Sequence, residues 1–293
     1  MAFIDDQALV DRVINSYVPD GPFMVMGPEH LEPIFRQFGL DPHSTDPTIF
    51  DMESLSHFLQ PGVIALFEQL RIERHHHVLS VGEGNGAPSR LLAKMTGCRI
   101  TCVDISPIQL ETARRCALLH GVSELLELIE QNANKLDLGD RQFDRFYANE
   151  SACHWENKEE AFRRIVSHIK PGGLVGFNDW ICGSEGQLTD AEKEVEAFNG
   201  LYQHDVWRQI SLEEMCRLIE KAGCTVISAE DLTEEVDERL KKQLEKLEAM
   251  TRLGKRCGWH HEPTERAVPY YRAMIATHFR FGRYGRVIAR VNG

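Results

Sequence analysis

A glycine-rich segment between an apolar run and an amphipathic run restricts the fold of this chain more than any other feature. Residues 78–81 (Val-Leu-Ser-Val) predict a buried strand, residues 82–86 (Gly-Glu-Gly-Asn-Gly) predict a tight turn, and Pro88 marks the start of a helix. Because glycine has no Cβ atom, the backbone of such a turn can bend sharply and approach a ligand closely. The pattern predicts a strand–turn–helix unit with a ligand site at the turn.

Short apolar runs alternate with amphipathic segments from Arg71 onward, which is the pattern of a parallel sheet covered by helices. Capping boxes at 106–109 and 211–214 predict two helix starts. Further helices are expected at 158–169, ending at a proline-glycine-glycine run, and at 234–257. The strands are expected at 78–81, 99–103, 126–130, 143–148, 174–178, 225–229 and 286–291.

The first 70 residues differ in texture, because several prolines separate short apolar helical stretches such as 62–70. We expect residues 1–70 to form a helical lid on the sheet, and residues 71–293 to form the main domain. Within that domain, residues 234 to about 283 are expected to be a helical insertion before the last strand.

Composition and charge narrow the classes of partner. The chain has 293 residues, of which 42% are hydrophobic, so a sizeable core is expected without stabilising cross-links. The net charge of −12 disfavours nucleic acid, because phosphate backbones are bound by clustered lysine and arginine. An acidic N-terminal segment and the lack of a long apolar run predict a cytoplasmic protein without a membrane partner. The eight cysteines form no CxxC pair, so reduced thiols and no metal site are expected.

The glycine turn admits two ligand families on a Rossmann-like sheet. With Ala87 it matches the dinucleotide pattern GxGxxA, and Asp104 lies 20 residues past Gly84, where an acid binds ribose hydroxyls. These residues therefore predict a ligand with an adenosine group, and they leave open a nicotinamide-dependent oxidoreductase. A cofactor-binding protein without turnover is a further alternative.

Several runs taken together resemble one enzyme superfamily. VLSVGEGNGAPSRLLA, CRITCVDISPIQLETAR, the pair 132–133 (Asn-Ala), YANE and IKPGGLVGFNDW resemble, in this order, the motifs of class I S-adenosylmethionine-dependent methyltransferases. Their texture is most similar to the branch of sarcosine/dimethylglycine, phosphoethanolamine and tocopherol methyltransferases. The resemblance implies a seven-stranded α/β sheet with an antiparallel last strand, and S-adenosylmethionine as cofactor without a metal. It also implies in-line methyl transfer to a small molecule, with an amine nitrogen as first acceptor and carbon, oxygen or sulfur open; a homodimer also stays open.

The same resemblance assigns cofactor contacts residue by residue. It places the turn against the methionine part of the cofactor, Asp104 on the ribose, Ile105 on the adenine face and Asn149 near the methionyl end. Related sequences usually carry an acid where this chain has Ser80, whose hydroxyl brings no negative charge. The full predicted set of cofactor-binding residues is Ser80, Gly82, Gly84, Gly86, Asp104, Ile105, Gln109, Asn132, Ala133 and Asn149.

Acceptor residues are expected after the fourth and fifth strands, because the carboxyl ends of parallel strands form the ligand site of such sheets. The predicted catalytic residues are His154, Tyr147 and Asp179. His154 is the expected base or orienting donor, since imidazole titrates nearest to neutrality; the alternative is a loop histidine bonded to backbone. The predicted substrate-binding residues are Glu150, Trp155, Trp180, Tyr270, Tyr271 and Arg280. For both tryptophans the alternative is plain packing between lid and sheet.

Two histidine tracts are less informative. Residues 75–77 precede the first strand, on the side of the sheet opposite the expected site, so a solvated turn is favoured over a metal tract. His260 and His261 lack the i, i+4 spacing of a helical metal site.

Overall fold

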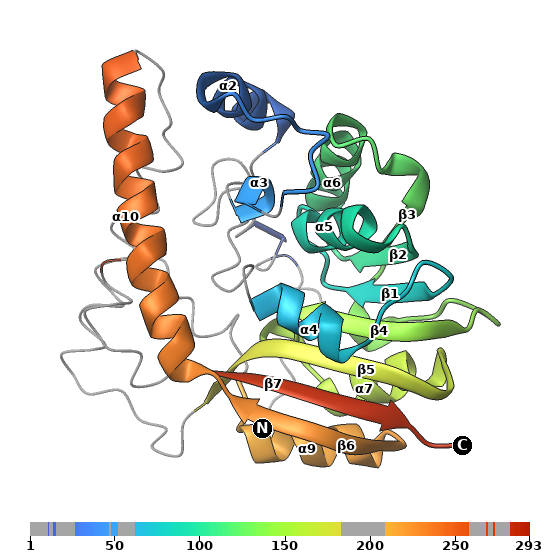
Figure 1. Ribbon diagram of the computed structural model, residues 1–293. Helices are drawn as coiled ribbons and strands as arrows, with labels where there is room; N and C mark the ends of the chain where they lie inside the picture. Colours follow the sequence, from blue (N-terminus) through green and yellow to red (C-terminus); the bar gives the residue numbers. More distant parts are fainter. Residues whose placement is uncertain are drawn as a thin grey trace.

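The computed structural model describes residues 27–46, 48–51, 62–182, 209–257 and 282–293, together with Asp11, Ile14, Asn15, Val268 and Arg272. Seven strands form one sheet in the order β3-β2-β1-β4-β5-β7-β6 (Figure 1). The pairs among β1 to β5 are parallel, and β7 runs antiparallel to both β5 and β6. The predicted sheet and its antiparallel last strand are confirmed. The strands are β1 (His77–Val81), β2 (Arg99–Asp104), β3 (Leu126–Glu130), β4 (Phe143–Asn149), β5 (Ile169–Cys182), β6 (Cys224–Asp231) and β7 (Gly282–Val291).

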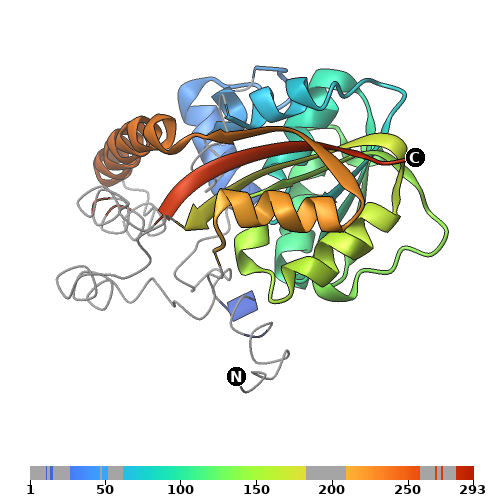
Figure 2. The same ribbon diagram turned by 90° about the horizontal axis from the view of Figure 1, so that it is seen from below.

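Helices cover both faces of this sheet (Figure 2). One hydrophobic core lies between the sheet and a layer made of α2 (Pro28–Phe38), α3 (Thr48–Asp51), α4 (Ile64–Gln69), α5 (Ala87–Thr96) and α6 (Pro107–Leu119). A second core lies on the opposite face, beneath α7 (Lys158–Ser167) and α9 (Leu212–Lys221). The described N-terminal helices thus pack into the same core as α5 and α6. Burial of apolar surface on both faces is what holds such a layered fold together.

Capping side chains begin the helices where the sequence predicts. The hydroxyl of Ser106 accepts a hydrogen bond from the backbone N–H of Gln109 at the start of α6, and Ser211 accepts one from Glu214 at the start of α9. Each bond satisfies one of the backbone donors that a helix N-terminus leaves without a partner.

The fifth strand is longer than predicted, and the helix before it is shorter. α7 ends at Ser167, and β5 begins at Ile169, because the N–H of Phe143 bonds to the carbonyl of His168 at 2.8 Å and so starts the pairing with β4 early. The proline-glycine-glycine run forms an irregularity within β5, where the register shifts, and Gly172 has a φ of +79°. Strand pairing thus overrides the local breaker signal there.

Helix α10 (Thr233–Cys257) follows β6 and extends beyond the end of the sheet (Figure 1). Val236 and Leu240 in its first part are buried, which agrees with a leucine stripe that packs on the protein's own core. Among the described helices, none combines the length and apolar character that crossing a membrane requires.

Candidate functional site

The carboxyl ends of the parallel strands bring the predicted ligand residues to one edge of the sheet. β1 ends at the glycine turn 82–86, β2 ends at Asp104, and β4 ends at Asn149. β1 lies between β2 and β4, so the turn is flanked on one side by Asp104 and on the other by the residues that follow β4. This is the edge at which doubly wound sheets bind their ligands.

Two glycines of the turn are required by geometry. Gly82 has a φ of +78°, and a Cβ atom built there would lie 2.2 Å from the Cβ of Ser151, whose hydroxyl bonds to the carbonyl of Val81 at 2.8 Å. Gly86 has a φ of +80° at the start of α5, where a Cβ atom would lie 3.0 Å from the Cβ of Ala113. A side chain at either position would push the turn away from β4 or α6.

Asp104 connects the glycine turn with the start of α6. Its Oδ2 accepts a hydrogen bond from the N–H of Gly84 at 2.8 Å, and its Oδ1 accepts one from Ser106 at 2.9 Å. Burial raises the pKa of this carboxyl above its ordinary value, while the backbone N–H bonds act in the opposite direction. Gln109 lies beside this link, since its Nε2 would be 3.8 Å from a Cβ atom on Gly84. The Oε1 of Gln109 is buried and has no hydrogen-bond partner among the described residues.

A buried carboxylate beneath the turn was not anticipated from the sequence. The Oε2 of Glu83 accepts a hydrogen bond from the hydroxyl of Ser89 at 2.8 Å, and the hydroxyl of Ser80 also donates to Glu83. Burial raises the pKa of Glu83, and its Oε1 has no hydrogen-bond partner in the described part of the chain. The carboxyl group that Ser80 lacks is thus supplied three residues later, and it lies next to the hydroxyl of that serine.

Tyr147 belongs to this same cluster. Its hydroxyl lies 2.5 Å from the hydroxyl of Ser89 and 3.4 Å from Glu83, and the side chain is only 1% exposed. Burial raises its pKa well above the ordinary value of a phenol, and the charge of Glu83 adds to the effect. These contacts indicate that Tyr147 supports the turn, and a catalytic role for it stays a prediction.

The carboxylate of Asp179 accepts hydrogen bonds from backbone N–H groups, most of them in the segment after β4. Its Oδ2 accepts the N–H groups of Ser151 and Ala152 at 3.2 and 2.6 Å, and its Oδ1 accepts those of Cys153 and Trp180 at 3.3 and 2.8 Å. The side chain is completely buried, and burial raises its pKa to about 6. The contacts give Asp179 the role of a cap for the 3₁₀ turn η4 (Ala152–His154), and a catalytic role for it stays a prediction.

Glu150 is held at the site by two aromatic side chains. The hydroxyl of Tyr284 donates to its Oε1 at 3.0 Å, and the indole Nε1 of Trp180 donates to its Oε2 at 3.3 Å. The two rings meet edge to face, with centroids 5.1 Å apart and planes at 90°. Glu150 has a φ of +53°, which is strained for a residue with a side chain, and such strain concentrates at functional positions. Sequence reasoning missed Tyr284, although the antiparallel pairing of the last strand places it opposite Trp180.

His154, the last residue of η4, and Trp155, which follows it, differ in their surroundings. Trp155 is 6% exposed and packs edge to face on Phe162 and Phe177, within the core under α7, so its location agrees with the packing alternative. His154 is half-buried at the end of η4, next to the turn that Asp179 caps, and its role as a base stays a prediction.

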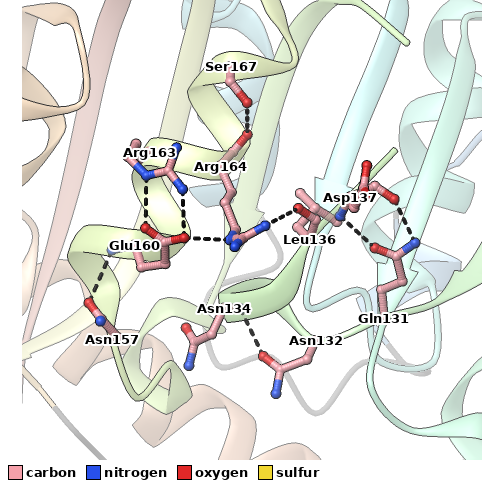
Figure 3. Close-up of polar contacts among 10 residues, drawn as sticks. All are labelled: Gln131, Asn132, Asn134, Leu136, Asp137, Asn157, Glu160, Arg163, Arg164 and Ser167. Carbon is pink, nitrogen blue, oxygen red and sulfur yellow. Dashed lines mark hydrogen bonds and ion pairs between the residues drawn. The ribbon is translucent and has the colours of Figure 1, made fainter. Parts of the chain in front are cut away.

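The segment after β3, the outer neighbour of β2 in the sheet, is held by hydrogen bonds of its own residues (Figure 3). The Oδ1 of Asn132 accepts the N–H of Asn134 at 2.8 Å and so caps the short turn η3 (Ala133–Lys135), in which Ala133 is buried. Gln131 closes the same loop through two hydrogen bonds with the backbone of Asp137, each 2.9 Å long. Ile105 is half-buried beside Asp104. Tyr270, Tyr271 and Arg280 lie outside the described residues.

Among the described residues, no group of three or more histidine, cysteine, aspartate or glutamate side chains is placed to hold a metal ion. His77 begins β1, at the edge opposite the glycine turn, and its Nε2 lies 2.9 Å from the hydroxyl of Thr101.

Comparisons with known proteins agree with this geometry. Residues 79–177 match a family described as a methyltransferase domain. The chain is 30% identical to methyltransferase GfsG of Streptomyces halstedii over 196 residues, 67% of this chain and 66% of that protein. It is 26% identical to sterol 24-C-methyltransferase of Saccharomyces cerevisiae over 167 residues, 57% of this chain and 44% of that protein.

A solved structure shares the fold. Phosphoethanolamine N-methyltransferase 2 of Haemonchus contortus, in complex with phosphomonomethylethanolamine and S-adenosylhomocysteine, superposes with a TM-score of 0.70 at 17% identity, over 90% of this chain and 61% of that chain. The matches thus span from less than half to about two thirds of the length of these relatives. Sheet order, motif sequence and these likenesses together show that the chain belongs to the class I S-adenosylmethionine-dependent methyltransferase superfamily.

Proposed function

We propose that this protein binds S-adenosylmethionine at the glycine turn and transfers its methyl group to a small molecule. The observation that carries the proposal is the 2.8 Å bond between the N–H of Gly84 and the carboxylate of Asp104, which joins the turn after β1 to the acid after β2. This link joins a glycine-rich turn to an acid suited to ribose hydroxyls, at the edge of the sheet where such folds bind ligands.

The residues present fit the adenosyl sulfonium. The turn is free of Cβ atoms at Gly82, Gly84 and Gly86, where the backbone adopts positive φ angles and can approach the methionyl chain closely. Each carboxylate oxygen has more than one lone pair, so Asp104 can accept ribose hydroxyls while it keeps its backbone bonds. The buried carbonyl of Gln109, which has no hydrogen-bond partner among the described residues, offers a further acceptor next to the turn.

Asn132, Ala133 and Ile105 would enclose the adenine, and Asn149 would meet the methionyl end. Ala133 is buried and Ile105 is half-buried, and both offer apolar contacts to the adenine. Asn149 is half-buried and offers a polar contact. The bound sulfonium supplies an activated methyl group with a good leaving group already in place. The protein's own contribution is therefore to align the acceptor and to exclude water.

Charge balance indicates the kind of acceptor. Transfer of a methyl group from a sulfonium moves one positive charge onto the acceptor, whether that atom is an amine nitrogen or an electron-rich carbon. The carboxylate of Glu150, held by Tyr284 and Trp180 beside the predicted site, stabilises such a charge. The aromatic rings next to it can present their faces to a cation. We therefore propose an amine nitrogen as the first acceptor, and carbon, which the sterol relative's name specifies, as the second.

The test is incubation with S-adenosylmethionine labelled in its methyl group and a pool of small metabolites, followed by mass identification of the product. A methylated amine confirms the first acceptor, and a new carbon–methyl bond shifts the assignment to the second. Calorimetry with S-adenosylhomocysteine and, separately, with a reduced nicotinamide cofactor checks the ligand. Binding of the nicotinamide compound alone would overturn the proposal, whereas binding of S-adenosylhomocysteine without any methylated product would favour a protein without turnover.

A further inference from the structure

Four polar residues are register partners on the neighbouring strands β4, β5, β7 and β6. Asn149 on β4 is the register partner of Asn178 on β5, Asn178 is the partner of Arg286 on β7, and Glu230 on β6 is also the partner of Arg286. Residues directly opposite each other in a sheet project to the same face, so these side chains form one line, which we name the polar row. Although both residues are polar, Asn178 is fully buried and Arg286 is only 4% exposed.

Hydrogen bonds run along the polar row in one direction. The Nε of Arg286 donates to the Oδ1 of Asn178 at 2.9 Å, and the Nδ2 of Asn178 donates to the Oδ1 of Asn149 at 3.3 Å. A guanidinium group can only donate, so Asn178 must turn its oxygen toward Arg286 and its amide nitrogen toward Asn149. Asn149 must then turn its own oxygen toward Asn178. The chemistry of Arg286 fixes the orientation of both amides.

Arg286 is itself held from two other sides. Its Nη2 donates to the carbonyl of Gly62, two residues before α4, at 2.8 Å, and its Nη1 lies 3.6 Å from the carboxylate of Glu230. The Nδ2 of Asn178 also reaches the carbonyl of Gly62, at 3.2 Å. The guanidinium therefore cannot rotate without the loss of several bonds in a buried place, where such losses are costly.

The near end of the polar row meets the proposed cofactor site. Ser80 on β1 is the register partner of Tyr147 on β4, so Asn149, two residues further along β4, lies level with the beginning of the glycine turn. With its oxygen directed to β5, the Asn149 amide directs its nitrogen away from β5. An amide nitrogen donates and does not accept, so it suits a carboxylate and not an ammonium group.

We infer that Arg286 is a positioning residue which, through Asn178, sets the amide of Asn149 to donate to the carboxylate of the methionyl group. The inference rests on the proposed function, because it takes S-adenosylmethionine as the ligand. It adds that a residue on the last strand, remote from the glycine turn, determines how the amino-acid end of the ligand is recognised.

The variant Asn178→Asp tests this directly. The new carboxylate still accepts from Arg286, but it cannot donate to Asn149, so the amide of Asn149 turns over and presents its oxygen to the ligand carboxylate. The dissociation constants of S-adenosylhomocysteine and of 5′-methylthioadenosine, which lacks the amino-acid end, are measured by calorimetry. We expect the first to rise about tenfold, which is about 1.4 kcal/mol, and the second to change by less than about twofold.

A matched control is Asn157→Asp, which makes the same change at the N-cap of α7 and retains an acceptor for the N–H of Glu160. It should leave both dissociation constants unchanged. If Asn178→Asp fails to unfold cooperatively, Arg286→Lys replaces it, because one ammonium cannot bond to both Asn178 and Gly62 in the geometry of the guanidinium, and the same selective loss is expected.

The outcomes separate the two claims. An equal change in both dissociation constants, or no change for S-adenosylhomocysteine, would overturn the role of the polar row and leave the proposed function standing. A wild-type protein that binds neither compound would overturn the proposed function itself.

Discussion

The hydroxyl of Ser89, in the first turn of α5, donates a 2.8 Å hydrogen bond to the carboxylate of Glu83 in the glycine turn. Ser80 donates to the same carboxylate from the end of β1, and Tyr147 lies 3.4 Å away on β4. The side chain of Glu83 therefore connects the turn to residues of β1, β4 and α5. The position at which related sequences carry an acid is occupied here by a serine, and Glu83 supplies the missing carboxylate from the turn itself.

A double-mutant cycle on Ser80 and Glu83 tests whether one carboxylate is needed in this space. Ser80→Asp alone places a second carboxylate beside Glu83 in a buried site, and it should lower the free energy of unfolding by about 1–3 kcal/mol. In the Glu83→Gln background the same substitution should cost less, because the new acid is then the only one. Urea unfolding of all four proteins gives the coupling, which we expect at about 0.5–3 kcal/mol. Strictly additive effects would contradict the idea that the two positions share one charge.

The sequence predicted the sheet well because its signals are local. Apolar runs, the Ser106 and Ser211 caps and the glycine turn each depend on a few adjacent residues, and the seven strands appear where these signals place them. β5 departs from its prediction because pairing of Ile169 with Phe143 extends it backward through a proline-glycine-glycine run. Local breakers are overridden when a neighbouring strand offers partners.

The candidate site was less predictable because its side chains meet through the sheet order. Glu150 and Tyr284 are 134 residues apart in the chain, and they contact because the last strand inserts between β5 and β6. Trp155 follows β4 just as Glu150 does, yet the turn η4 directs its ring to the face covered by α7. Sequence position alone does not reveal on which side of such a turn a ring lies.

Replacement of Asp104 tests the ribose contact and the turn together. Asp104→Ala removes the acceptor for the N–H of Gly84 and the charge that ribose hydroxyls would meet. We expect S-adenosylhomocysteine to bind more weakly by about 1–3 kcal/mol in calorimetry. Asp104→Asn keeps one acceptor oxygen and should lose less. Unchanged affinity in the alanine variant would contradict the placement of the ribose.

The stability of the protein should depend on pH through Asp179. Burial raises its pKa to about 6 in the folded state, so between about pH 4 and 6 the folded protein binds more protons at this site than the unfolded chain does. The contribution is therefore present at low pH and is lost as the pH rises through about 6, by on the order of 3 kcal/mol. Asp179→Asn lacks this titration.

The measurement is the free energy of unfolding of both proteins between pH 4 and 7. The wild-type value minus that of Asp179→Asn should decrease as the pH rises across this window. A difference that is independent of pH would show that folding leaves the pKa of Asp179 in its ordinary range, and one that increases would show that folding lowers this pKa. The comparison removes the contributions of all groups that the two proteins share.

Trp155 separates packing from ligand binding. Its ring packs on Phe162 and Phe177 in the core under α7, so Trp155→Ala should lower the free energy of unfolding by about 3–5 kcal/mol, and Trp155→Phe should lower it less. The affinity of the folded variant for S-adenosylhomocysteine should not change. If the variant instead kept its stability and selectively lost methylation of the acceptor, Trp155 would have to bind the acceptor.

Tyr284 provides the sharpest test of the acceptor side, because its hydroxyl and its ring do different things. Tyr284→Phe keeps the edge-to-face contact with Trp180 but removes the donor to the Oε1 of Glu150. The carboxylate then keeps the 3.3 Å bond from Trp180, so its position loosens while its charge stays. Once the acceptor is identified, we expect kcat/KM for that acceptor to fall about tenfold, which is about 1.4 kcal/mol of transition-state stabilisation.

The dissociation constant of S-adenosylhomocysteine should stay within about twofold, since the hydroxyl of Tyr284 bonds to Glu150, whereas the predicted cofactor residues lie at or after the ends of β1, β2, β3 and β4. Glu150→Gln is the matched comparison, because it keeps the size of the side chain and removes its charge. If charge is what the acceptor requires, this variant should lose more activity than Tyr284→Phe. Equal losses would mean that placement of the side chain matters and its charge does not, and a parallel loss of cofactor affinity would put Glu150 on the cofactor side of the site.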